Sequence, residues 1–269
     1  MRIGVISDLH IDRHPTLYTE DYVEALSLQV RRKSVELLII AGDIANQFEL
    51  VNDFLKELKG YLNIRILFIP GNHDFWSDHQ SYSSLEVLEM YKRMDGCLLA
   101  HPHIIDDEWA IIGHTGWYDY SYASNKFSVE RLARGKYYGA TWQDKVRIDW
   151  PYEDRELSKH AAQLIENDLQ SIGNRKAILV THIVTHPAFA VPLPHRLFDF
   201  YNAYIGTSDI EPLYRRFPIR YSVMGHVHFR KRMTEKGITY ICPCLGYQRQ
   251  WRTQDISQEI SDALQVIDL

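Results

Sequence analysis

The sequence predicts an α/β fold in which helices cover a parallel or mixed β-sheet. Short apolar runs rich in valine and isoleucine recur along the chain, and they end in polar or glycine residues, as buried strands do. Between several of these runs the apolar residues follow the helical period instead, and an alternation of strand and helix is typical of parallel sheets. With 269 residues, of which 45% are hydrophobic and 24% charged, the chain can fill one large core.

Eight segments have the length and composition of buried strands. They are Ile3–Ser7, Glu36–Ala41, Ile64–Pro70, Trp109–Gly113, Ala177–Thr181, Tyr221–Gly225, Ile238–Ile241 and Ala263–Ile267. Two further segments carry an apolar stripe at helical spacing. The first is predicted to run from Leu50 to a terminating glycine, Gly60, and the second from an N-cap at Asp154 to Gly173.

We expect a single domain over residues 1–269, with a variable, aromatic-rich insertion at about residues 117–152. This insertion holds six of the 17 tyrosines and three of the six tryptophans. The rings either form a lid that stacks a flat group of the substrate or cover an edge of the fold.

Net charge restricts the classes of partner. The chain has 30 Lys and Arg against 35 Asp and Glu, a net charge of −5, which disfavours duplex nucleic acid and anionic membranes as partners. A local basic groove containing Arg131, Arg134 and Lys136 could still contact nucleic acid. The sequence shows no secretory signal and no apolar stretch long enough to span a membrane. We therefore expect a cytoplasmic protein whose three cysteines are thiols.

Side chains with metal-ligand chemistry follow five of the apolar runs. They are Asp8 and His10, Asp43, Asn72 with His73 and Asp74, His182, and His226 with His228. In open α/β sheets ligands bind at the carboxyl ends of the strands, so these side chains are expected to meet. Buried Asp8 and Asp43 would be costly without cations beside them. Because these side chains offer more ligands than one metal ion can bind, the sequence predicts two divalent ions that share a carboxylate.

Other residues compete for roles in or near this site. His186 is an alternative ligand to His182, but His182 directly ends a strand, so His186 is assigned to a possible substrate pocket. His114 also ends a strand and is a second candidate for that pocket. Tyr247 and Trp251 are candidates for its rim. Asp12-Arg13-His14 lies past a strand end and is interpreted as a solvated loop, and His101-Pro102-His103 lacks the glycine turn and contains a proline, so neither is assigned as a ligand pair.

In their order and context the five blocks resemble the calcineurin-like metallophosphoesterase superfamily. The blocks occur in the family's order between Met1 and about residue 245. The resemblance implies a four-layer α/β/β/α sandwich with mixed sheets and a dinuclear metal site at the carboxyl ends of the strands. The metals would be divalent or trivalent transition-metal ions such as Mn, Fe, Zn or Ni.

The resemblance also assigns a role to each residue of the blocks. One ion would be held by Asp8, His10, Asp43 and His228. The other would be held by Asp43, Asn72, His182 and His226, with Asp43 as the bridge. His73 would hydrogen-bond a substrate oxygen, and Asp74 would orient its imidazole and favour the protonated form.

The activity implied by the resemblance is phosphoester hydrolysis, in which a hydroxide between the two ions attacks phosphorus in line. The family's protein phosphatases carry an arginine after the Gly-Asp block, where this chain has Ile44 and Ala45. This difference favours a phosphodiester, with a phosphorylated small molecule or nucleotide as substrate. The alternatives are a phosphomonoesterase acting on a small metabolite and a non-catalytic scaffold that binds partners. Retention of every ligand position weighs against the scaffold.

Overall fold

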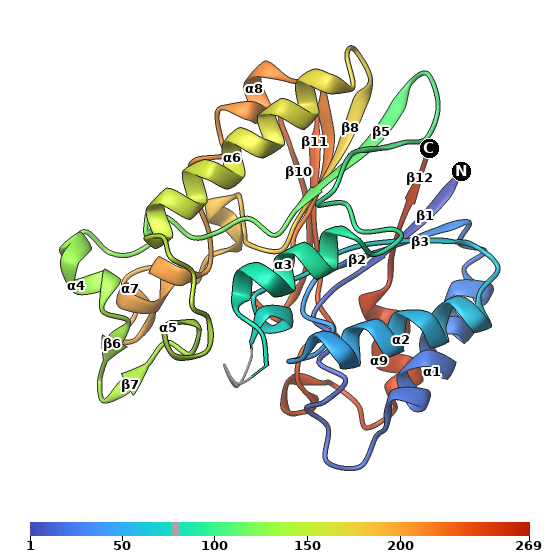
Figure 1. Ribbon diagram of the computed structural model, residues 1–269, viewed down its shortest axis with the longest axis horizontal. Helices are drawn as coiled ribbons and strands as arrows, with labels where there is room; N and C mark the ends of the chain where they lie inside the picture. Colours follow the sequence, from blue (N-terminus) through green and yellow to red (C-terminus); the bar gives the residue numbers. More distant parts are fainter. Residues whose placement is uncertain (77–80) are drawn as a thin grey trace.

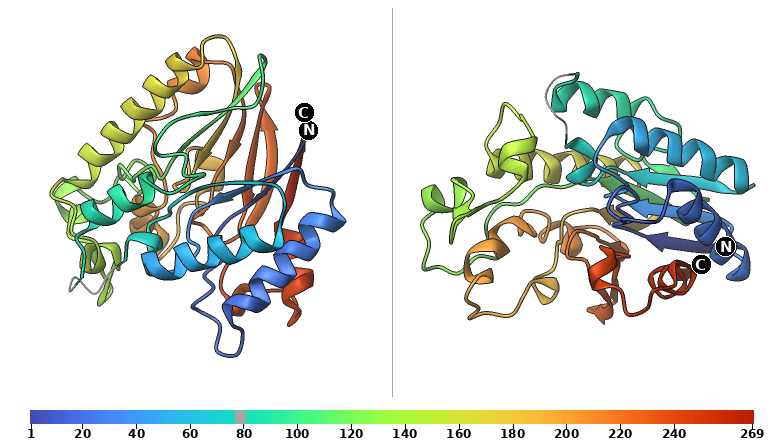
Figure 2. Two further views of the ribbon diagram at one scale, coloured as in Figure 1. Left: turned by 45° about the vertical axis from the view of Figure 1, so that its right-hand side comes forward. Right: turned by 90° about the horizontal axis from the view of Figure 1, so that it is seen from below.

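The computed structural model describes residues 1–76 and 81–269. Two β-sheets pack face to face, and helices cover the outer face of each (Figures 1 and 2). The first sheet has the strand order β12-β1-β2-β3. Its strands are β1 (Arg2–Ile6), β2 (Leu37–Ala41), β3 (Arg65–Ile69) and β12 (Gln265–Asp268). β1, β2 and β3 are parallel, and β12 pairs antiparallel with β1.

The second sheet has the strand order β10-β11-β9-β8-β5-β4. Its strands are β4 (His103–Ile104), β5 (Trp109–His114), β8 (Lys176–Thr181), β9 (Ile219–Val223), β10 (Arg230–Glu235) and β11 (Ile238–Pro243). The four central strands are parallel, whereas β4 and β10 lie antiparallel at the edges. Both sheets are therefore mixed, as the resemblance implied.

Helices form the two outer layers. Over the first sheet lie α1 (Thr19–Arg32), α2 (Phe48–Tyr61), α3 (Ser84–Lys92) and α9 (Ile256–Ala263). Over the second lie α6 (Asp154–Ser171) and α8 (Leu213–Arg216). Four short 3-10 helices follow strands or helices: His73–Phe75, Pro187–Phe189, Asn202–Tyr204 and Gln248–Gln250. The predicted four-layer sandwich is confirmed. Among the described residues, no helix combines the length and apolar character that a membrane crossing needs.

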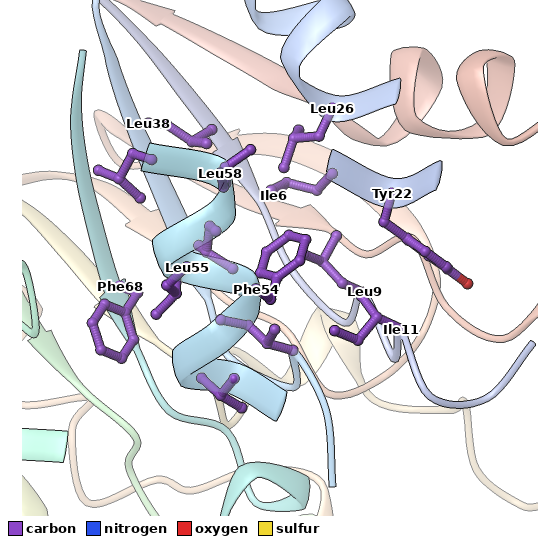
Figure 3. Packing of buried hydrophobic residues seen from close by; sticks show 14 of the residues in the cluster. Ile6, Leu9, Ile11, Tyr22, Leu26, Leu38, Phe54, Leu55, Leu58 and Phe68 are labelled. Atoms are coloured by element: carbon purple, nitrogen blue, oxygen red, sulfur yellow. The ribbon is translucent and has the colours of Figure 1, made fainter. Parts of the chain in front are cut away.

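Strand periodicity divides the core into two sides. Along β1, Ile3 and Val5 face the other sheet, whereas Ile6 faces the helices. Figure 3 shows Phe54 and Leu58 of α2 packed on this helical side, close to Ile6. Strands that are buried on both faces read as continuous apolar runs in the sequence. That explains why the strand predictions agree closely with the structure.

The aromatic-rich segment extends beyond the two sheets, at the lower left of Figure 1. It contains α4 (Val129–Ala133), β6 (Lys136–Tyr137), β7 (Ala140–Thr141) and α5 (Asp144–Arg147), and it packs against α7 (Phe198–Tyr201). Trp117, Tyr118 and Tyr120 are buried in a small core with Phe200 and Tyr204. Most of these rings thus cover an edge of the fold.

The ends of both predicted helices differ in detail from the prediction. Gly60 lies inside α2, which continues to Tyr61, so this glycine does not stop the helix. At the start of α6 the N-cap is Glu153, and Asp154 is the first helical residue. The carboxylate of Asp154 is buried and accepts a hydrogen bond from Trp117 Nε1 at 3.0 Å. A buried partner for Asp154 cannot be read from the local sequence.

Replacing Gly60 by alanine should raise the free energy of unfolding by about 0.5–1 kcal/mol, because alanine loses less backbone entropy in a helix. A Cβ at this position meets no atom within 4 Å. Gly139→Ala is the matched control, since its Cβ is equally unobstructed but its φ is +77°. Urea denaturation should show stabilisation for Gly60→Ala and destabilisation for Gly139→Ala. Two shifts of the same sign would contradict this explanation.

Candidate metal centre

Loops at the carboxyl ends of five strands, taken from both sheets, meet at one point. Asp8 and His10 follow β1, Asp43 follows β2, and Asn72 follows β3. His182 follows β8, and His226 and His228 follow β9. Backbone hydrogen bonds join these loops: Asp8 N donates to Gly42 O at 2.9 Å and Gly225 N to His182 O at 2.9 Å. The sheet edges therefore fix the relative positions of side chains that are far apart in the sequence.

Five of these residues have left-handed backbone conformations. Their φ angles are 55° for Asp8, 44° for His10, 54° for Asp43, 74° for His226 and 54° for His228. Such angles are uncommon outside glycine and cost free energy, so they persist only where the surrounding structure imposes them. They turn each chain sharply just after its strand and aim the side chain at the common point.

Glycines in the motifs let the loops approach closely. A Cβ at Gly225 would lie 2.8 Å from Asp8 Oδ2 and 2.9 Å from His182 Nδ1. A Cβ at Gly71 would overlap the Asp43 carboxylate, and one at Gly42, whose φ is +87°, would lie 2.6 Å from Gly71 N. These positions exclude any side chain because the space belongs to the clustered polar groups.

The first cluster consists of Asp8, His10, Asp43 and His228, each of which offers one ligand atom within 4.8 Å of the others. His10 Nε2 lies 3.0 Å from His228 Nε2 and 3.7 Å from Asp43 Oδ2. His228 Nε2 lies 3.4 Å from Asp8 Oδ1. Three of these side chains are buried, and His228 reaches the surface. Two carboxylates and two imidazoles at such distances can hold a divalent metal ion.

The second cluster shares Asp43 and adds His182 and His226. His182 Nε2 lies 3.3 Å from Asp43 Oδ2. Asn72 Oδ1 lies 3.0 Å from His182 Nε2 and 2.8 Å from His226 Nδ1. The amide of Asn72 is oriented by Asp144, which accepts a hydrogen bond from Asn72 Nδ2 at 2.9 Å. All seven predicted ligand residues therefore lie in two adjoining clusters with Asp43 in common.

The outer ring nitrogens of three histidines face oxygen acceptors. His182 Nδ1 donates to Ala41 O at 2.9 Å, and His226 Nε2 donates to Tyr204 O at 3.0 Å. His228 Nδ1 donates to Gln250 Oε1 at 3.0 Å. In a neutral imidazole a proton on the outer nitrogen leaves a lone pair on the inner one, which is the form that binds metal. The hydrogen bonds thus select the tautomer that a metal site requires.

The charges of the cluster also fit metal binding. Asp8 and Asp43 are fully buried, and Asp43 Oδ2 has no hydrogen-bond donor among the described residues. Burial opposes ionisation of Asp43, but the surrounding imidazoles, first His182 and then His73, lower its pKa well below the usual value. Burial likewise opposes the charge on His182, but the Asp43 carboxylate raises the pKa of His182 to about 10. Asp43 therefore requires a positive charge beside it.

The imidazoles of His10 and His226 are held in the neutral form. Burial, together with the neighbouring His228 and His73, lowers the pKa of His10 well below its usual value. Burial and the neighbouring His182 lower the pKa of His226 to about 3. Neutral imidazoles beside the ionised Asp43 carboxylate form a donor set that fits transition-metal ions.

The orientation of His73 differs from the prediction. His73 Nδ1 donates to Asn46 Oδ1 at 2.9 Å, and the Asn46 amide in turn donates to Asp12. Asp74 therefore does not orient the imidazole, because the chain turns between the two residues and points their side chains apart. Burial lowers the pKa of His73 to about 4, and a neutral amide partner does not counteract this shift. The protonated form that was expected from Asp74 is thus not favoured by its surroundings.

Asp74 instead fastens two of the loops together. Its carboxylate accepts hydrogen bonds from four backbone N–H groups, those of Asp43 at 2.8 Å, Ile44 and Ala45 at 2.9 Å, and Gly71 at 2.7 Å. Both oxygens are fully used, and the side chain is buried. Asp74 is therefore a structural residue of the site that holds Asp43 in its left-handed conformation.

We expect Asp74→Asn to lower the free energy of unfolding by about 2–5 kcal/mol, because an amide nitrogen would face two buried N–H donors and leave them unpaired. Asp53→Asn on the exposed face of α2 is the matched control. Urea denaturation of both variants in chelator measures the effect without any contribution from metal. A loss below about 1 kcal/mol for Asp74→Asn would argue against this fastening role.

Two predicted pocket residues lie elsewhere. His186 Nε2 pairs with Glu235 Oε2 at 3.0 Å, because the 3-10 turn that follows His186 carries it away from the cluster. His114 accepts a hydrogen bond from Gly116 N and lines a different cavity, which shares no residue with the one at the clusters. Their assignment to the substrate pocket is therefore corrected. Trp251 packs on His14 and donates to Gly246 O, whereas Tyr247 lies at the cluster as predicted for the rim.

A cavity of about 420 Å³ opens onto the two clusters. Its lining includes Asp43, Asn72, His73, Trp76, Trp142, His226, His228 and Tyr247. Trp76 and Trp142 were not singled out in the sequence, and neither was Asp144, which accepts hydrogen bonds from both indoles at 2.7 and 2.9 Å. Burial raises the pKa of Asp144 to about 6. Trp76 directly follows the turn that carries His73, whereas Trp142 and Asp144 are brought to the clusters by the packing of residues 117–152.

A family model and two relatives match parts of this chain. The sequence model of the calcineurin-like phosphoesterases matches residues 1–230. Two relatives from strains of Helicobacter pylori, each described as an uncharacterized metallophosphoesterase, are 27% identical over 78 and 93 residues. These matches cover 28% and 34% of this chain but only 20% and 24% of the relatives.

Solved structures share the fold. The phosphopantetheinyl hydrolase of Mycobacterium tuberculosis superposes with a TM-score of 0.77 and 20% identity, over 98% of this chain and 95% of that one. A dimetal phosphatase from Danio rerio gives a TM-score of 0.54 and 15% identity, over 90% and 86%. At such identities the likeness concerns the fold alone.

Proposed function

Because the chain belongs to the calcineurin-like phosphoesterase family, we propose that it is a metal-dependent hydrolase that favours phosphodiesters. The observation that carries this proposal is the pair of clusters that share the buried Asp43. In this proposal, one ion is bound by Asp8, His10, Asp43 and His228, and the other by Asp43, Asn72, His182 and His226. Two such ions would activate a water molecule and neutralise charge on the phosphoryl group.

His73 is the residue that acts on the substrate in this proposal. Its Nε2 lies 4.0 Å from Asp43 Oδ2 and 3.4 Å from the Tyr247 hydroxyl, so it faces the space above the clusters. Because Nδ1 donates to Asn46, only Nε2 faces the clusters, and once the ring is protonated its Nε2–H can donate to a phosphoryl or leaving-group oxygen. Asn46 positions the ring, as an outer partner does for a catalytic histidine.

Preference for a diester is supported by the residue that follows the Gly-Asp block. Ile44 is fully buried, and its backbone N–H is bonded to Asp74. The position after the Gly-Asp block, where the family's protein phosphatases carry an arginine against a phosphomonoester dianion, is therefore not cationic here. A diester, which carries one negative charge, needs less compensation at that position.

Hydrolysis of two aryl esters tests this function. We expect turnover of bis(p-nitrophenyl) phosphate with Mn²⁺ or Zn²⁺ supplied, a lower kcat/KM for p-nitrophenyl phosphate, and loss of both activities in chelator. Reconstitution with each metal separately controls for metal identity, since mixed nitrogen and oxygen ligands accept several ions. Preferred hydrolysis of the monoester would favour the phosphomonoesterase alternative. A metal content below about one ion per chain, with no turnover, would favour the non-catalytic scaffold.

Phosphopantetheinyl diesters are the first natural substrates to test. The Mycobacterium tuberculosis neighbour is named a phosphopantetheinyl hydrolase and has the same fold along almost the whole chain. An ester that links phosphopantetheine to an alcohol is a phosphodiester, so it matches the proposed chemistry. Cytoplasmic location is part of the same proposal and is supported by three buried cysteines that carry free thiols, Cys97, Cys242 and Cys244.

A further inference from the structure

Three arginines lie beside the metal centre although the chain has a net charge of −5. Arg13, Arg147 and Arg249 line a hollow of about 420 Å³ together with Trp76 and Tyr247. Trp76, Tyr247 and Arg249 also line the cavity above the metal clusters, so the two hollows adjoin. Guanidinium groups gathered at a cavity create a positive local potential that the net charge of the chain does not reveal.

Aromatic rings hold the three guanidinium groups. The Arg147 Cζ atom lies 5.1 Å from the centre of the Trp76 ring, and the Arg13 Cζ atom lies 5.7 Å from it. The Arg249 Cζ atom lies 5.3 Å from the centre of the Tyr247 ring. Contact with a ring face orients a guanidinium group and leaves its N–H edge available to an anion.

The same two rings contact His73. Trp76 stacks on the imidazole with 3.6 Å between the ring centres, and the Tyr247 hydroxyl lies 3.4 Å from His73 Nε2. The rings of Trp76 and Tyr247 therefore lie between His73 and the three arginines. A substrate whose phosphate binds at the clusters would have the arginines on the far side of these rings. This arrangement places positive charge outside the metal centre, along the path of a substrate group.

Nearby carboxylates offset only part of this charge. Asp12 lies 3.8 Å from the Arg13 Nε atom. Neither Arg147 nor Arg249 forms an ion pair with any residue in the ranges 1–76 and 81–269. Asp144 is turned to Asn72 and the two indoles instead. With respect to the described residues, the guanidinium groups of Arg147 and Arg249 are thus exposed and have no carboxylate partner.

We propose that Arg13, Arg147 and Arg249 bind a second phosphate group, so that the preferred substrate is a phosphodiester that carries an additional phosphate. The inference rests on the proposed phosphodiesterase function, in which the scissile phosphate binds at the metal clusters. The planar fork of arginine matches the oxygens of a phosphate and binds them in pairs. Binding energy from this remote group serves to hold the scissile bond in place during reaction.

Matched substrates test the second site. We would compare p-nitrophenyl alkyl phosphates whose propyl or hexyl chain ends either in a phosphate or in a methyl group, using the metal-loaded protein. The expected result is a kcat/KM about tenfold or more higher for the phosphate-ended member at one chain length, falling as salt is added. Arg147→Gln and Arg249→Gln should each reduce this ratio about three- to tenfold. Arg220→Gln, exposed in β9 away from both hollows, should leave the ratio unchanged.

The outcomes separate this inference from the proposed function. Equal kcat/KM for both members at both chain lengths would overturn the second site, as would arginine variants that lower both values alike. If no ester is hydrolysed, the proposed function fails, and calorimetry then tests the site by itself. Tighter binding of hexanediol bisphosphate than of hexyl phosphate, weakened by Arg147→Gln, would support the site. Equal affinities would overturn it.

Discussion

Replacing Asp43 by asparagine should abolish phosphodiester hydrolysis and reduce the bound metal to less than about one ion per chain. Asp43 is the only residue common to the two ligand clusters of the described chain, and its buried Oδ2 lies within 4.0 Å of the inner nitrogens of His10, His73 and His182. An amide supplies neither the charge nor the bridging oxygens that two cations need. We expect kcat/KM to fall at least about 10³-fold, which corresponds to roughly 4 kcal/mol.

Asparagine is chosen because it preserves the shape of the site. Asp43 Oδ1 accepts a hydrogen bond from His73 N at 2.8 Å, and the amide oxygen of asparagine can accept the same bond. Metal content by elemental analysis and kcat/KM for bis(p-nitrophenyl) phosphate would be measured on the same preparations. Asp53→Asn, exposed on α2, serves as the control for both measurements. Full activity of Asp43→Asn would refute the shared-carboxylate mechanism.

His73→Gln should lower kcat about 10²- to 10⁴-fold while both metal ions remain bound. His73 is not a member of either cluster, yet its Nε2 faces them at 4.0 Å from Asp43 Oδ2. Loss of its imidazole removes the only described histidine that both faces this space and lies outside the ligand set. The expected effect is therefore on the chemical step and not on metal affinity.

Two measurements distinguish that effect from a structural one. Metal content and thermal unfolding of the His73→Gln variant should equal those of the wild type, because the stacked Trp76 is itself held by Asp144. His101→Gln, in the exposed turn before β4, should leave kcat unchanged. If His73→Gln lost metal in proportion to its activity, His73 would have to be counted among the ligands.

The residues predicted a parallel or mixed sheet covered by helices because these signals are local, and the family resemblance implied the four layers. Buried strands read as short apolar runs; seven of the eight runs correspond to parallel strands and one to the antiparallel β12. Helices on the surface show only one apolar stripe. Two of them, α2 and α6, were predicted from it, whereas α1, α3 and α9 were not. Gly60 shows the same limit, because a glycine near a helix end does not reveal whether the helix stops there.

The candidate ligands were also readable from the sequence, because each directly follows a strand. The structure brings all seven together, while metal binding by them stays a prediction. The residues that hydrogen-bond and orient the site side chains could not be predicted from the sequence. His73 is oriented by Asn46 and not by its neighbour Asp74, since the direction of two adjacent side chains depends on the turn between them.

The sequence by itself therefore determined most strands of this protein and the identity of the residues that gather at the strand ends, and the family resemblance supplied the four layers. Only the tertiary structure decided what surrounds them: the left-handed turns, the four N–H groups on Asp74, the reach of Asp144 from the aromatic segment and the three arginines around Trp76 and Tyr247. The physical reason is the distance along the chain over which each property is set. Strand burial and ligand type are properties of a few consecutive residues, whereas orientation, charge compensation and substrate contacts arise between segments up to about two hundred residues apart, which only the packed fold brings together.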